Sequence, residues 1–115
     1  MRSKSELIDI SKSFDTDCRF FSFYEFAVKY ISNIKLKGIT ETDVFFSTIK
    51  KLGDNSNIKA NFSAFGKQSK NSSEIIKPWC MMILGRRADV SDLDMDELHF
   101  VMGYCSRLAK IAEIK

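Results

Sequence analysis

Apolar residues recur three or four positions apart along most of this chain, a spacing typical of amphipathic α-helices packed around a common core. The clearest example is the segment TETDVFFSTIKKLG at 40–53, where Thr40 can cap the first turn and Gly53 can end the last. Acids near its start and lysines near its end suit the two ends of the helix dipole. This segment predicts a helix.

Similar signals predict four further helices, over 5–14, 19–38, 78–84 and 91–115. Ser3 or Ser5 can cap the first, and Gly38 can stop the second. Pro78 is expected to begin the fourth, and Ser91 or Asp94 to cap the fifth, with Glu97 completing a capping box with Asp94. The stretch 58–73 predicts a short helix and then a polar loop. The sequence therefore predicts an all-α fold, a compact single-domain bundle of five or six helices over residues 1–115.

Several classes of protein are disfavoured by composition. The longest apolar run, WCMMIL, is about six residues, whereas a membrane span needs roughly 20. No continuous apolar stretch follows the N-terminal charges, so we expect no signal peptide and a cytoplasmic location. Three widely spaced cysteines (Cys18, Cys80 and Cys105) predict buried reduced thiols rather than disulfides or a zinc site. With one histidine and no catalytic or phosphate-loop motif, we expect a non-enzymatic protein without metal or cofactor.

Charge is segregated along the second half of the chain. Residues 50–87 hold eight basic side chains against two acidic ones. A basic block of this kind can neutralise phosphates and release counterions, and interleaved amides and hydroxyls can bond backbone oxygens. The first hypothesis is therefore an accessory subunit that contacts DNA or RNA backbone within a larger nucleoprotein complex such as a CRISPR-type effector. The chain is similar to the small basic subunits of such effectors in size, helicity and charge only. Its predicted contacts are Lys50, Lys51, Lys59, Lys67, Lys70, Lys77, Arg86 and Arg87, assisted by Asn61, Gln68 and Asn71.

The second hypothesis concerns the acidic segment that follows. Five acids and no base occupy 89–97, which would suit a regulator or inhibitor, of phage or mobile-element type, that blocks a basic surface of a host complex. Self-association is compatible with either hypothesis. The predicted protein contacts are Asp89, Asp92, Asp94, Asp96 and Glu97.

The run KPWCMMILGRR at 77–87 joins the two charged regions. It is apolar nearly all round, which predicts a helix inside the bundle or under a partner, and both methionines are favoured for the core. Arg86 and Arg87 emerge after Gly85, and the sequence leaves open whether they pair with neighbouring acids or with a partner. A helix-turn-helix over 60–79 is disfavoured, since Gln68 stands at the turn-glycine position and Pro78 would fall inside the recognition helix.

Overall fold

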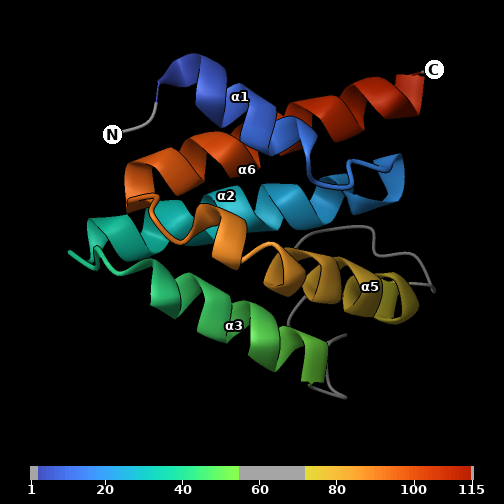
Figure 1. Cartoon of the computed structure of the whole chain (residues 1–115). Coiled ribbons are helices and arrows are strands. Elements are labelled where there is room, and N and C mark those ends of the chain that lie inside the picture. Colours follow the sequence, from blue (N-terminus) through green and yellow to red (C-terminus); the bar gives the residue numbers. More distant parts are fainter. Residues whose placement is uncertain (1–2, 55–71, 115) are drawn as a thin grey trace.

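The computed structural model describes residues 3–54 and 72–114, and this part of the chain contains α-helices, two short 3-10 helices and no strand. The elements are α1 (Lys4–Lys12), η1 (Cys18–Phe20), α2 (Phe21–Leu36), α3 (Thr42–Asp54), α5 (Ser72–Gly85), η3 (Ala88–Val90) and α6 (Met95–Ile114). Figure 1 shows α1 and α6 on one side of the molecule, α3 and α5 on the other, and α2 between them. The predicted compact all-α bundle is confirmed, with five helices in the described residues.

The core lies where α2 faces its neighbours. The main helix pairs are α2 with α6, α3 with α5, and α1 with α6. Trp79 of α5 is completely buried, and its ring centroid lies 5.6 Å from that of Phe23 and 5.7 Å from that of Tyr24, both on α2. Burying rings of this size removes about 150–250 Å² of surface each from water, so these aromatic contacts fix α5 against α2.

Helix ends follow the predicted capping chemistry. The Ser3 hydroxyl accepts from the Glu6 backbone N–H at the start of α1. After α2, Gly38 has φ +81°, and Gly38 and Ile39 donate to the carbonyls of Lys35 and Ile34, a Schellman arrangement that only glycine adopts without strain. These ends explain why the chain reverses where it does.

The predicted start of the fourth helix is wrong. The structure begins α5 at Ser72, so Pro78 lies inside the helix and Lys77 before it is helical. A residue before proline is only biased against helical backbone angles. The free energy gained by burying Trp79 and Ile83 on one side of α5 outweighs this bias at Lys77.

Two burial predictions are also corrected. Met82 packs half-buried against the core, as predicted, but Met81 is 72% exposed because its position on α5 points away from the buried Ile83. All three cysteines are free, as predicted, and Cys80 and Cys105 are buried. Cys18 is exposed, because η1 holds it at the surface.

Among the helices described, none is both long and apolar enough to cross a membrane.

Candidate functional site

Three of the predicted phosphate contacts lie near one end of the α3–α5 pair. A Cβ on Gly53 would stand 3.2 Å from the Cβ of Cys80, so the C-terminal end of α3 touches α5 there. Lys50 and Lys51 belong to that end of α3, and Lys77 precedes Cys80 by about one helical turn. All three side chains are exposed. We call Lys50, Lys51 and Lys77 the lysine end.

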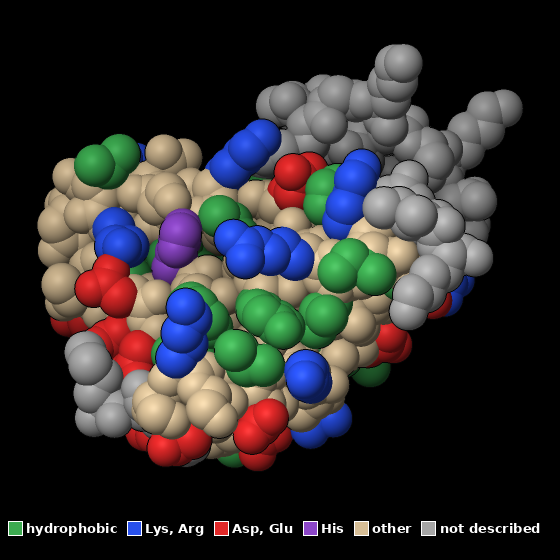
Figure 2. All heavy atoms as spheres, turned by 90° about the horizontal axis from the view of Figure 1, so that it is seen from above, with side chains coloured by type: hydrophobic (Ala, Val, Ile, Leu, Met, Phe, Trp, Pro, Cys, Tyr) green, Lys and Arg blue, Asp and Glu red, His purple; other side chains and the backbone are tan. Residues whose placement is uncertain are grey.

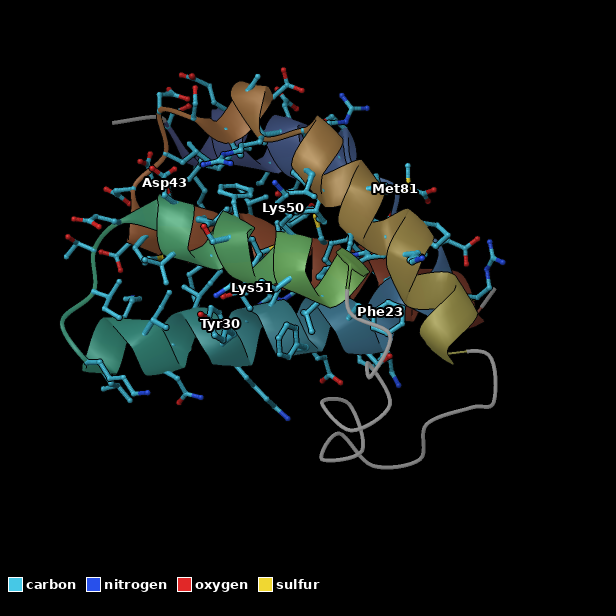
Figure 3. All side chains as sticks on the ribbon, turned by 90° about the horizontal axis from the view of Figure 1, so that it is seen from below. Phe23, Tyr30, Asp43, Lys50, Lys51 and Met81 are labelled. Carbon is cyan, nitrogen blue, oxygen red and sulfur yellow. The ribbon has the colours of Figure 1, made fainter. Side chains whose placement is uncertain are left out.

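The lysine end is not paired with any acidic side chain that the structure describes. Asp54 and Glu74 are not among those side chains, and none of the acids that are forms an ion pair with these three lysines. Figure 3 shows Lys50 on the α5 side of α3 and Lys51 on the α2 side, so the two charges flank the helix.

The other lysines and amides of the basic block lie outside the described residues. They are Lys59, Lys67, Lys70, Asn61, Gln68 and Asn71. In the sequence, residues 55–71 connect the end of α3 to the start of α5, and they contain three lysines and no acid.

The two arginines lie at the opposite end of the pair and are bound by acids. Arg87 Nη2 donates to Asp43 Oδ1 at 2.8 Å, and its guanidinium lies 5.3 Å from the centroid of the Phe46 ring. Arg86 Nη1 lies 3.4 Å from Asp89 Oδ2. The question that the sequence left open is answered in part: each arginine has an acidic partner within the chain, although all four side chains remain substantially exposed.

The acidic segment largely serves the start of α6. Asp94 accepts from the Glu97 backbone N–H at 2.8 Å, and Glu97 accepts from the Asp94 N–H at 3.1 Å, which is the predicted capping box. Glu97 is only 7% exposed. Asp96 pairs with Lys35 of α2, and this hydrogen-bonded ammonium lowers the pKa of the Asp96 carboxyl. Asp92 is exposed on the turn before α6.

Sequence reasoning missed a hollow on the outer side of α6. Its volume is about 190 Å³, and it is lined by His99, Phe100, Gly103, Tyr104 and Arg107. The rings of Phe100 and Tyr104 are stacked, with centroids 6.2 Å apart. These five positions share one helical face, so their spacing indicates a common surface, but the sequence does not show that this surface is left uncovered. We call this feature the Gly103 hollow.

Polar contacts fix one edge of the Gly103 hollow. His99 Nε2 lies 3.0 Å from the Ser32 hydroxyl on α2. Burial, together with the charge of Lys35, lowers the pKa of the His99 imidazole, so its neutral form is favoured; Asp96 opposes this effect. The imidazole is thus an uncharged hydrogen-bonding group at neutral pH.

A second hollow, of about 230 Å³, lies where the α2–α3 connection meets the start of α6. Its charged residues include Lys35 and Asp96, which already pair with each other. Across the described ranges, no three histidine, cysteine or acidic side chains gather in a way that could hold a metal ion.

Comparison of this chain with models of known protein families, with curated proteins and with solved structures found no match.

Proposed function

We propose that this chain is a non-enzymatic helical accessory protein that contacts nucleic-acid backbone through its lysine end. The observation that carries the proposal is that Lys50, Lys51 and Lys77, on two helices that touch at Gly53 and Cys80, are all exposed and form no ion pair with the acidic side chains that the structure describes. Unpaired surface lysines attract phosphate without base-specific contacts, because each contact releases a condensed counterion.

The chain between the two helices strengthens this proposal. Residues 55–71 join the two helix ends that bear the lysines and add three positive charges and no negative one. In the sequence, Lys59, Lys67 and Lys70 therefore stand between the two helices that carry the lysine end. Arg86 and Arg87 are weaker candidates, because binding phosphate would compete with Asp89 and Asp43.

A small binding protein of this kind would act as part of a larger nucleoprotein complex. Three lysines and a short basic connection offer few phosphate contacts, which gives weak binding at physiological salt. A second attachment, to a protein of the complex, would raise the effective concentration of the lysine end near the nucleic acid.

The competing hypothesis, a regulator that binds through the acidic segment, has less support. Asp94 and Glu97 cap α6, Asp96 pairs with Lys35 and Asp89 pairs with Arg86. A partner that took these carboxylates would have to replace interactions that stabilise the start of α6.

The experiment is equilibrium binding of the full chain to fluorescein-labelled single- and double-stranded DNA and RNA over a salt series. The test variant is Lys50→Gln/Lys51→Gln, and the matched control is Lys4→Gln/Lys12→Gln on α1, across the bundle from α3 (Figure 1). Both variants remove two exposed charges. We expect log K to fall linearly with log salt, and the slope of the test variant to be shallower by about two.

The control should keep the slope of the wild-type chain. If the salt slope became equally shallow in both double variants, binding would depend only on net charge. The lysine end would then not be the contact surface. Absence of binding to all four nucleic acids at roughly 50 mM salt would overturn the proposal, because electrostatic contacts are stronger there than at physiological ionic strength.

A further inference from the structure

Gly103 lies in the middle of α6, and the described fold gives no packing reason for a glycine there. A Cβ built on it meets no atom within 4 Å, and its backbone is not left-handed. In a helix interior, glycine is about 1 kcal/mol less favourable than alanine. Gly53 differs, because Cys80 approaches it to 3.2 Å. The glycine at 103 therefore leaves an open space at the surface of α6 and does not make room for a neighbour in the core.

That space is the Gly103 hollow. Its volume of about 190 Å³ is below the 300–1,000 Å³ typical of sites that enclose a small molecule. It suits a single apolar side chain of a docked segment, seated over Gly103 between His99 and Arg107 and beside the stacked rings of Phe100 and Tyr104. Anchors of this kind, seated in a pocket lined by aromatic residues, contribute much of the energy of a protein interface.

The charge beside the hollow is positive at its Arg107 end, whereas the ion pair of Lys35 and Asp96 lies near its His99 end. Arg107 lines it and is exposed, and no carboxylate of the described residues pairs with it within 4.0 Å. Lys110 follows one turn later, with its ammonium 5.1 Å from the centroid of Phe21. Figure 2, seen from the side of α1 and α6, shows hydrophobic side chains gathered in the middle of this face with Lys and Arg side chains around them. Most Asp and Glu side chains in this view lie toward the edges.

An apolar hollow bordered by cations is complementary to an acidic amphipathic segment. A helix or extended peptide with one large apolar side chain and flanking carboxylates would bury the apolar group over Gly103 and place negative charge beside Arg107. A nucleic-acid strand fits less well, because Phe100 and Tyr104 already stack on each other rather than standing apart to receive a base between them.

We propose that the Gly103 hollow docks an acidic amphipathic segment of a partner protein. The hollow and the lysine end lie on opposite sides of the bundle, formed by α6 and by the α3–α5 pair (Figure 1). The two surfaces are therefore independent: one would hold the chain to a protein while the other contacts nucleic acid. The proposal rests on the geometry of α6 and does not require the lysine end to bind anything.

The test is a selection of peptides from a display library of random 16-residue sequences, using the full wild-type chain as target and the Gly103→Leu variant for counter-selection. Leucine is a good helix former and its side chain would extend into the hollow, since no described atom opposes a Cβ at this position. The best peptide is then synthesised, and its affinity is measured for four proteins: wild type, Gly103→Leu, Arg107→Glu and Lys50→Glu. Circular dichroism establishes that each variant is folded.

We expect selected peptides that are acidic and carry an aromatic or large aliphatic anchor. Gly103→Leu and Arg107→Glu should each weaken binding by about tenfold or more, as loss of a central contact does. Lys50→Glu, on the opposite side, should leave the affinity unchanged. Failure to enrich any peptide, enrichment of basic peptides, or equal binding to Gly103→Leu would each overturn the proposal. An oligonucleotide that binds wild type and is lost on Gly103→Leu would overturn it as well, by assigning the hollow to nucleic acid.

Discussion

Arg87 and Asp43 join the C-terminal end of α5 to the first turn of α3, with Arg87 Nη2 donating to Asp43 Oδ1 at 2.8 Å. The same guanidinium lies over the ring of Phe46. One arginine thus makes an ion pair and a cation–π contact with two residues of the same helix, and both contacts hold the α3–α5 pair together at the end opposite the lysines.

The first prediction concerns the strength of this pair. Its side chains are 49% and 80% exposed, so solvent screens the interaction, and exposed pairs of this kind contribute about 0.2–1 kcal/mol. In a double-mutant cycle of Asp43→Asn and Arg87→Gln, urea unfolding should give a coupling energy in that range. Arg87→Gln alone should cost more than Asp43→Asn alone, because only the arginine also contacts Phe46. Equal single costs would contradict the cation–π contribution.

The second prediction links the same pair to binding. Asp43→Asn removes the carboxylate that competes for Arg87. If a nucleic acid on the lysine end extends along α3 toward Arg87, this variant should bind several-fold more tightly, with a salt slope steeper by about one. The measurement is the salt series described for the lysine variants, with Asp9→Asn of α1 as the control for loss of one exposed acid. If both variants gain equally, the effect is one of net charge, and Arg87 takes no part.

The third prediction concerns three glycines with different surroundings. Gly103→Ala should raise the free energy of unfolding by about 0.5–1 kcal/mol, because alanine favours the helix and nothing opposes its Cβ. Gly38→Ala should lower it by about 1–2 kcal/mol, since Gly38 has φ +81°. Gly53→Ala should gain less than Gly103→Ala, because its Cβ would press against Cys80. Urea unfolding of the three variants should rank their free energies of unfolding in this order. If Gly103→Ala were less stable than wild type, the space beside Gly103 would not be open.

Local signals predicted most of the fold. The capping box of Asp94 and Glu97, the stop at Gly38 and the apolar spacing of α2, α3 and α6 are properties of neighbouring residues, and the structure confirms them. The start of α5 was mispredicted, because the rule for the residue before Pro78 is local, whereas the packing of Trp79 against α2 is not.

The candidate surfaces were less predictable, because charge along a sequence does not specify its partners in space. Arg87 pairs with Asp43, 44 residues away in the sequence, and no local spacing rule predicts that pairing. The basic block therefore divides into the lysine end and two arginines that pair with acids. Met81 was assigned to the core from the apolar character of its neighbours, and only the orientation of α5 places it outside. The Gly103 hollow depends on the absence of a neighbour, which a sequence does not record.

The fourth prediction concerns the thiols. Burial raises the pKa of the Cys105 thiol to about 12, and Cys80 is completely buried, whereas Cys18 is exposed. Because the thiolate is the reactive form, Ellman's reagent at neutral pH should modify one thiol rapidly in the native protein and all three in denaturant. Cys18→Ser should abolish the rapid reaction. Rapid modification of Cys105 in the native state would show that α6 separates from α1, where Cys105 Sγ lies 3.4 Å from the Ser11 carbonyl oxygen.

The last prediction is a loss of stability in mild acid that depends on His99. Burial and Lys35 lower the pKa of His99 below its ordinary value of 6.5, although Asp96 acts in the opposite direction. As the pH falls below 6.5, the histidine protonates in the unfolded chain, whereas in the folded chain it stays neutral down to a lower pH. The free energy of unfolding therefore decreases. His99 is the only histidine in the chain, so the effect between about pH 7 and pH 5 should be assignable to it. His99→Gln keeps a hydrogen-bonding group near Ser32 but does not titrate. Urea unfolding at both pH values should therefore show a smaller decrease for His99→Gln than for wild type, and a wild-type protein that gains stability in mild acid would mean that Asp96 dominates the environment of the imidazole.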